Sequence, residues 1–221
     1  MSENEEDVER IIELNENLKE NNEKLAAKNS AELKSHNIRS FDVVGAIGAG
    51  KTLILEKIVE KVSQKYRCFV ICGDVTTRID SERIEKAGAR VQQINTGREC
   101  ALNAYHIFKV ISALDLDEID LLFIENVGNL ICPSDFILGA DMRIVIVSLP
   151  EGAHVIQKHP LLFRMSEIGV INKIDLQPYL DIDVDRMLRD AYAINPNIQM
   201  FLTSATTGEN LDQLIAYLGL D

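Results

Sequence analysis

The residues from Gly45 to Thr52 have the types and spacing of a phosphate-binding loop. They complete the eight-position pattern G-x-x-x-x-G-K-[ST]. Glycines let backbone N–H groups approach phosphate oxygens, Lys51 can reach the β- and γ-phosphates, and the Thr52 hydroxyl can ligate Mg²⁺. The alternative is a chance glycine-rich turn. We predict that a nucleoside triphosphate is bound here by Gly45, Ala46, Gly48, Ala49, Gly50, Lys51 and Thr52.

The segments on either side of the loop fit this prediction. Residues 41–44 form a short apolar run typical of a buried strand, and residues 53–59 have the periodicity of an amphipathic helix. Strand, glycine loop and helix are the arrangement that the pattern requires, because the positive end of the helix dipole then faces the anion.

A second motif, Asn172-Lys173-Ile174-Asp175, follows the apolar run 168–171 and resembles the N-K-x-D base reader of GTPases. The Asp175 carboxylate can accept hydrogen bonds from N1–H and the 2-amino group of guanine, a donor pair that adenine lacks. We expect Asn172 to tie the base site to the phosphate loop and the stem of Lys173 to cover one face of the purine.

A third motif is the run Ser204-Ala205-Thr206, which follows the strand-like residues 199–203. It resembles the short S-A-x loop that closes over guanine in the same proteins. Three motifs in this order on three strand ends indicate a guanine nucleotide site that includes Ser204 and Ala205.

Two acidic residues end apolar strands in the middle of the chain. Glu125 follows residues 121–124, with Gly128 three positions later, and Asp74 follows residues 68–72. Mg²⁺ takes carboxylate oxygens and retains several waters. We predict that Thr52, Asp74 and Glu125 hold Mg²⁺ and form the catalytic group with Lys51. Asp74 would hold either the water shell of Mg²⁺ or a nucleophilic water, and the alternative for Glu125 is a surface residue at a strand end.

Charge and length limit the possible classes of protein. The 221 residues carry 23 Lys and Arg against 35 Asp and Glu, a formal net charge of -12, which opposes binding to nucleic acid or to an anionic membrane. No run approaches the ~18 apolar residues of a spanning helix. The N-terminus is acidic instead of basic and apolar, so we expect a cytoplasmic protein.

Strand and helix patterns alternate from residue 41 onward and predict an α/β, three-layer P-loop NTPase fold with a mostly parallel sheet. Residues 1–35 predict an extra acidic N-terminal helix that precedes a P-loop GTPase domain at 36–221. Its apolar stripe is interrupted at Asn21 and Asn22. The helix is expected to dock on the domain or on a partner subunit, or to remain solvated and fray. The strand candidates are 41–45, 68–74, 90–94, 120–125, 143–149, 168–172 and 198–203.

Several segments together resemble the hydrogenase nickel-incorporation GTPases, the HypB family. They are residues 125–133 (E-N-V-G-N-L-I-C-P), 95–100, 73–75 and 151–152. The resemblance implies a GTP-hydrolysing metallochaperone that dimerises on nucleotide binding. It implies that the protein assists nickel insertion into the large subunit of [NiFe]-hydrogenase with a partner metallochaperone. The alternatives are a urease-type nickel-insertion GTPase and a non-catalytic GTP-binding assembly scaffold. No Gln follows Gly128 to orient water, so slow hydrolysis is expected.

Four cysteines, at positions 68, 72, 100 and 132, are too few for a disulfide framework. We expect free thiols or metal ligands. The resemblance implies that Cys100 and Cys132 hold Zn²⁺ or Ni²⁺ at a subunit interface, although Ala101 stands where the family has a His ligand. Two thiolates need further ligands, and a symmetric dimer can supply four cysteines from two chains. Cys68 and Cys72 are expected to pack in the core.

Overall fold

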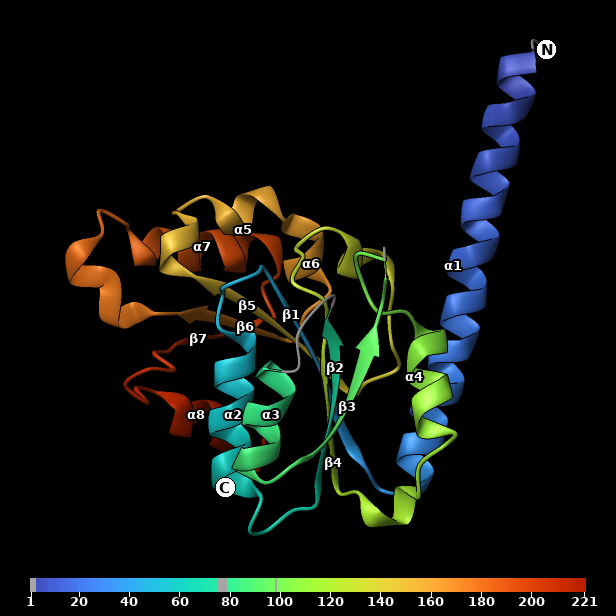
Figure 1. The fold of residues 1–221 in the computed structure, drawn as a ribbon. Helices are drawn as coiled ribbons and strands as arrows, with labels where there is room; N and C mark the ends of the chain where they lie inside the picture. Colours follow the sequence, from blue (N-terminus) through green and yellow to red (C-terminus); the bar gives the residue numbers. More distant parts are fainter. Residues whose placement is uncertain (1–2, 75–78, 98) are drawn as a thin grey trace.

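The computed structural model describes the backbone of residues 3–74, 79–97 and 99–221, and the side chains from residue 17 onward except 74–80 and 98. A sheet of seven strands runs through this part of the chain in the order β3-β2-β4-β1-β5-β6-β7, and every strand pair is parallel (Figure 1). The predicted three-layer α/β fold is confirmed, and the sheet is parallel throughout.

The strands are buried and short, as apolar runs between helices predict. Their bounds differ from the predicted ones by no more than two residues at either end. They are β1 Arg39–Gly45, β2 Cys68–Asp74, β3 Arg90–Asn95, β4 Leu121–Glu125, β5 Met142–Ser148, β6 Ile168–Asn172 and β7 Gln199–Leu202.

Helices cover both faces of the sheet. One face packs against α2, α3 and α8 around Phe41 and Val43, and the other packs against α5, α6 and α7 around Val44 at one end and against α1 and α4 at the other. Alternate residues of β1 therefore point into different cores. The helices are α1 Glu3–Ser35, α2 Lys51–Val62, α3 Ile79–Ala87, α4 Ala104–Ile111, α5 Val155–Lys158, α6 Pro160–Arg164, α7 Val184–Ile194 and α8 Leu211–Tyr217.

Helix α1 packs against α4 through its C-terminal half, and its N-terminal half projects away from the body (Figure 1). Leu33 is buried among residues of α4 and the neighbouring strands. Asn22, which we expected to interrupt the apolar stripe, is itself buried, whereas the adjacent Asn21 is exposed. The buried stripe of α1 thus includes polar residues.

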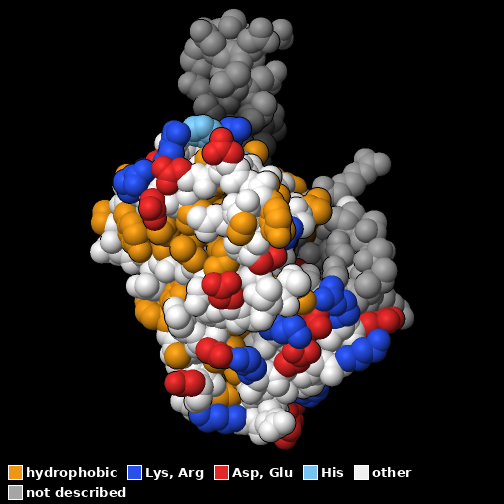
Figure 2. Space-filling model, turned by 90° about the vertical axis from the view of Figure 1, so that its left-hand side faces the viewer, with side chains coloured by type: hydrophobic (Ala, Val, Ile, Leu, Met, Phe, Trp, Pro, Cys, Tyr) orange, Lys and Arg blue, Asp and Glu red, His pale blue; other side chains and the backbone are white. Residues whose placement is uncertain are grey.

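Among the described residues, no helix combines the length and the apolar character needed to cross a bilayer. On the face shown in Figure 2, Lys and Arg side chains alternate with Asp and Glu side chains instead of forming a continuous basic surface.

Candidate nucleotide-binding site and cysteine pair

The phosphate-loop residues connect the end of β1 to the first turn of α2, as the pattern requires. Lys51 is the first residue of α2 and is buried, and its Nζ donates hydrogen bonds to the carbonyl oxygens of Gly45 (3.2 Å) and Ala46 (3.0 Å). Beside the loop lies a cavity of about 400 Å³, which Lys51 and Thr52 help to line. The N-terminus of α2 therefore offers this cavity backbone N–H groups and a positive dipole end.

Gly50 is a loop position where a side chain would not fit. Its φ is +100°, and a Cβ atom would lie 2.3 Å from Nδ2 of Asn172. The Asn172 amide uses this space: Nδ2 donates to the carbonyl of Ala49 at 2.9 Å, and Oδ1 accepts from the N–H of Ala205 at 3.1 Å. The first and third sequence motifs are joined in space by the buried Asn172.

The side chains of Thr52 and Glu125 meet beside the loop. The Thr52 hydroxyl donates to Oε1 of Glu125 at 2.7 Å. The sheet register produces this contact, because Glu125 ends β4 directly beside Val43 of β1 and Cys72 of β2. Thr52 and Glu125 line the same cavity as Lys51. The side chain of Asp74, the third predicted magnesium ligand, lies outside the described residues.

The residues predicted to bind the base lie beside the phosphate loop, and Lys173 lines the same cavity as Lys51. Lys173 has φ +63°, and its Nζ donates to the carbonyl of Gly48 at 2.6 Å, so its stem runs along the loop. Oδ1 of Asp175 is buried and accepts no hydrogen bond from any described residue. A buried acceptor of this kind is costly unless a donor reaches it. Ser204 and Ala205 are buried in the adjoining loop, where Ser204 accepts from the N–H of Thr207 at 3.2 Å.

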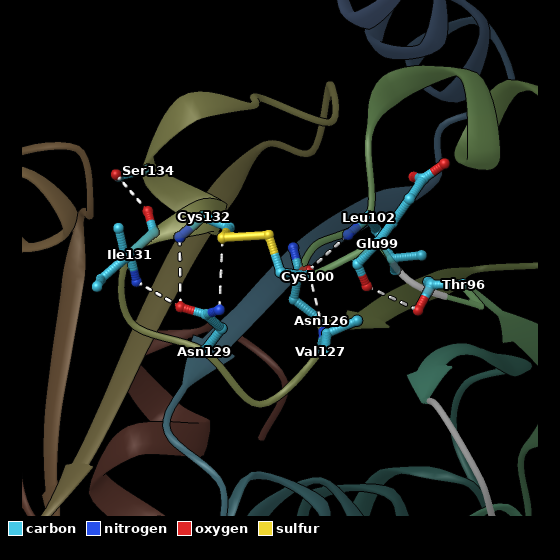
Figure 3. The surroundings of a disulfide bond; sticks show 10 residues. All are labelled: Thr96, Glu99, Cys100, Leu102, Asn126, Val127, Asn129, Ile131, Cys132 and Ser134. Carbon is cyan, nitrogen blue, oxygen red and sulfur yellow. Dashed lines mark hydrogen bonds between the residues drawn. A yellow bond between two sulfur atoms is a disulfide. The ribbon is translucent and has the colours of Figure 1, made fainter.

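Cys100 and Cys132 are joined by a disulfide, with their Cα atoms 6.0 Å apart (Figure 3). The expectation that none of the cysteines is paired was therefore wrong for these two. The physical reason is tertiary: the loop after β3 and the loop after β4 converge, although 32 residues separate the cysteines. This Cα separation lies in the range that a disulfide spans. Cys68 and Cys72 take no part in a disulfide and are buried in the core, as expected.

The surroundings of the pair are polar and ordered by side-chain amides. Asn129 accepts hydrogen bonds at Oδ1 from the N–H groups of Ile131 (2.7 Å) and Cys132 (3.3 Å), and its Nδ2 lies 3.4 Å from Sγ of Cys132 (Figure 3). Cys100 is exposed and Cys132 is partly exposed, whereas Ala101 is only 4% exposed. The two sulfur atoms thus lie at the surface, with residue 101 turned inward.

A buried polar path connects the two cysteine loops beneath the surface. Oδ1 of Asn126 accepts from the N–H of Leu102 at 2.9 Å, and its Nδ2 donates to Asp42 at 3.4 Å. Asp42 pairs with Arg143, whose Nη1 donates to the carbonyl of Pro133 at 3.0 Å. Asn126 also directly follows Glu125, so the cysteine pair and the nucleotide pocket share the end of β4.

Sequence reasoning missed this path. A signal was present, because Asp42 and Arg143 are charged residues within two apolar runs, and they lie side by side in the register of β1 and β5. Buried charges in neighbouring strands are rare unless they pair.

His106 takes part in the cap of α4. Its Nδ1 accepts from the N–H of Asn103 at 3.2 Å, and its backbone N–H donates to Oδ1 of Asn103, which together cap α4. Within the described residues, no group of three or more His, Cys, Asp or Glu side chains gathers as a metal site. The part of the chain that the structure describes therefore brings together two sulfur ligands, fewer than a closed zinc site requires.

The donor atoms fit the ions that the sequence predicts. The Thr52 hydroxyl and the Glu125 carboxylate offer hard oxygen ligands within one cavity, which suits Mg²⁺. In their reduced form, Cys100 and Cys132 offer two soft ligands at one surface point, which suits Zn²⁺ or Ni²⁺ when other donors complete the set.

Comparison with known proteins gives the class to which this fold and site belong. Residues 40–202 match the family model described as CobW/HypB/UreG, nucleotide-binding domain. The chain is 44% identical over 208 residues to a probable hydrogenase maturation factor HypB of Methanocaldococcus jannaschii, an alignment that covers 94% of each chain.

Two solved structures are similar over nearly the whole chain. The hydrogenase maturation factor HypB of Archaeoglobus fulgidus superposes with a TM-score of 0.85 at 38% identity and covers 91% of this chain and 99% of its own. HypB of Helicobacter pylori in complex with nickel gives a TM-score of 0.84 at 31% identity, with 90% and 93% covered. The chain belongs to the HypB branch of the CobW/HypB/UreG nucleotide-binding family.

Proposed function

We propose that this chain is a GTP-hydrolysing metallochaperone that assists nickel insertion into [NiFe]-hydrogenase during its maturation. The observation that carries the proposal is the position of two adjacent residues at the end of β4. Glu125 meets Thr52 in the nucleotide cavity, and Asn126 holds the loop of Cys100. A nucleotide site and a thiol pair therefore depend on the same strand end. The hydrogenase maturation factors among its relatives support this role.

Guanine selectivity would come from Asp175. The buried Oδ1 would accept one of the two donors on the guanine edge, and the second carboxylate oxygen would accept the other. Asn172 would keep this base site at a fixed distance from the phosphate loop through its bonds to Ala49 and Ala205. Adenine would leave the buried carboxylate unpaired, and this cost would account for most of the preference for GTP over ATP.

Hydrolysis would depend on charge placed around the phosphates. Lys51 would exchange its loop carbonyls for phosphate oxygens, and Thr52 and Glu125 would hold Mg²⁺, with Asp74 as a further ligand. When bound, Mg²⁺ neutralises the charge that develops on the phosphates. Slow turnover suits a switch, since the nucleotide state then lasts long enough to be read by another protein.

The metal would be bound by the reduced forms of Cys100 and Cys132, with the missing ligands supplied by water or by a second subunit. The structure of HypB of Helicobacter pylori in complex with nickel supports nickel as the metal. We propose that GTP favours a homodimer and that nickel passes with the help of a partner metallochaperone to the hydrogenase large subunit. A cytoplasmic location would keep the thiols reduced.

The test combines hydrolysis with metal binding. Single-turnover GTP hydrolysis should require Mg²⁺ and should be lost in Thr52→Val, which keeps the shape of the side chain but removes the hydroxyl. The reduced protein should bind Ni²⁺ with thiolate-to-nickel charge-transfer absorption, and Cys100→Ser should lose that absorption. GTP binding without magnesium-dependent hydrolysis would instead identify a scaffold.

A further inference from the structure

Two asparagines of α1 reach the two segments that carry the cysteines. Oδ1 of Asn22 accepts a hydrogen bond from the N–H of Ala104 at 2.8 Å, and Nδ2 of the same side chain donates to the carbonyl of Ile137 at 2.8 Å. Ala104 lies four residues after Cys100, and Ile137 lies five residues after Cys132. One side chain therefore bridges both cysteine segments.

Asn29 repeats this bridge two helical turns further along α1. Its Nδ2 donates to the carbonyls of Ala104 (2.9 Å) and Leu138 (3.0 Å), and the side chain is fully buried. Residues seven apart lie on the same face of a helix. Both backbone polar groups of Ala104 are thus bonded to α1, although the first turn of a helix normally leaves its N–H groups without a helical partner.

The helix also fits closely against the segment that follows Cys132. Gly139 has φ +92°, and a Cβ atom there would lie 2.2 Å from the carbonyl oxygen of Ala26. Lys19 pairs with Asp135 at 3.2 Å at the surface end of the same contact. The contact therefore runs along the helix from Lys19, which is exposed, to Asn29, and Asn22, Ala26 and Asn29 are its buried residues.

We propose that α1 is a clamp that positions the thiol pair. Asn22 and Asn29 hold the Cys100 segment against the Cys132 segment, so that the two sulfur atoms stay close together when no disulfide joins them. They are positioning residues, because neither touches the thiols. The inference rests on the proposed function only for what the pair binds; the juxtaposition of the thiols can be measured without a metal.

The clamp has a defined physical consequence. Two thiols on separate loops behave as a chelating pair only if their effective concentration is high, and this concentration falls when either loop moves independently. Asn22→Ala removes the bridge, so the N–H of Ala104 and the carbonyl of Ile137 lose their hydrogen bonds to this side chain. Asn22→Asp keeps the acceptor for Ala104 but cannot donate to Ile137, so it breaks only the side facing the Cys132 segment.

The first measurement is the thiol–disulfide equilibrium of the full-length chain in glutathione buffers. One glutathione disulfide accepts the two electrons from the thiols of Cys100 and Cys132, which gives the protein disulfide and two glutathione thiols. The equilibrium constant is the effective concentration of the pair. We expect it to fall about tenfold in Asn22→Ala and in Asn22→Asp, and similarly in Asn29→Ala.

Two controls separate positioning from general loss of stability. Asn21→Ala changes the same residue type on the exposed side of the same helix and should leave the equilibrium unchanged. Leu214→Ala in α8 removes a buried side chain on the other face of the sheet and should lower the melting temperature without moving the equilibrium. An unchanged equilibrium in all three clamp variants, or an equal fall in Leu214→Ala, would overturn the clamp.

The second measurement is titration of the reduced chain with Ni²⁺ alone, followed by thiolate-to-nickel charge-transfer absorption. The clamp predicts about tenfold weaker binding in Asn22→Ala than in Asn21→Ala. No such absorption in the parent would remove the metal from the proposed function, while a shifted thiol equilibrium would still support the clamp. If Asn22→Ala bound nickel as tightly as the parent while Cys100→Ser showed no charge-transfer absorption, the clamp would be overturned and the metal site would remain in place.

Discussion

The guanidinium of Arg143 lies against the carboxylate of Asp42, with 2.8 Å between Nε and Oδ2, and both side chains are almost completely buried. The pair sits between neighbouring strands in the interior of the sheet. The two side chains also make hydrogen bonds to the neighbouring loops. Asn126 donates to Asp42, and Arg143 donates to the carbonyls of Pro133 and Phe136. The ion pair thus supports the loop of Cys132 from below.

Arg143→Met should therefore destabilise the protein strongly, because it leaves the Asp42 carboxylate buried without its cation. Breaking a buried pair in this way costs about 3–5 kcal/mol. Arg189→Met is the matched control, since Arg189 pairs with Asp183 at 3.2 Å but both are exposed; its cost should stay below about 1 kcal/mol. Urea unfolding of the two variants gives the comparison, and equal losses would contradict the structural role of Arg143.

Asp175→Asn should reverse the preference of the base site. The amide cannot accept from both donors of guanine, so GTP should bind about tenfold more weakly or worse. Xanthosine triphosphate, which has an oxygen in place of the 2-amino group, should bind more tightly to the variant than to the parent. Nucleotide titrations check both effects, with Asp181→Asn as an exposed carboxylate control. If the parent bound ATP and GTP within about threefold of one another, the assignment of Asp175 would be wrong.

Lys51→Ala should abolish GTP hydrolysis while the domain stays folded. The ammonium group bonds to carbonyls of the loop at Gly45 and Ala46 and does not belong to the apolar core. Lys57 on the same helix pairs with Glu60, and Lys57→Ala should leave hydrolysis as in the parent. Phosphate release and thermal melting are the measurements. A Lys51→Ala protein that hydrolyses GTP at the parental rate would refute the phosphate-loop assignment.

The contribution of Asp120 to stability should depend on pH only in acid. Hydrogen bonds from Arg67 hold the pKa of Asp120 well below its usual value, at about 2. Since the folded pKa is lower than the unfolded one of about 4, the stabilisation is complete above that unfolded value and is lost as the pH falls through 2. The difference in urea midpoint between the parent and Asp120→Asn should thus shrink below pH 4. A difference that is constant down to pH 2 would contradict this account.

Reduced Cys68 should react slowly with iodoacetamide. Burial raises the pKa of its thiol to about 11, and the reactive thiolate is therefore scarce at pH 8. Cys100, which is exposed, serves as the internal control and should be alkylated first after reduction. Mass spectrometry of timed samples reports the order, and equal rates for the two cysteines would show that Cys68 is more accessible than its burial indicates.

Much of the fold, and the contacts among the motif residues of the candidate nucleotide site, could be predicted from the sequence. Apolar runs gave seven strands whose ends the structure places within two residues of the predicted positions. The phosphate loop, Asn172 and Ala205 were predicted from local motifs, and the structure brings them into contact. Local motifs suffice here because a parallel sheet carries the carboxyl ends of its strands to one edge. The motifs at these strand ends therefore meet at one edge of the sheet, and this holds without knowledge of the order of the strands.

Contacts between segments distant in the sequence were decided only by the tertiary structure. Asn22 looked like a break in an apolar stripe, yet it is buried because Ala104 and Ile137 offer it a donor and an acceptor. The approach of Cys100 to Cys132 likewise depends on where two loops converge, which no spacing along the chain reports. Motifs determined the chemistry that the chain carries, because glycine, lysine and carboxylate side chains act through local geometry. The partners of its buried polar groups were set by packing, because a buried donor or acceptor is satisfied by whichever segment the fold brings within hydrogen-bonding distance.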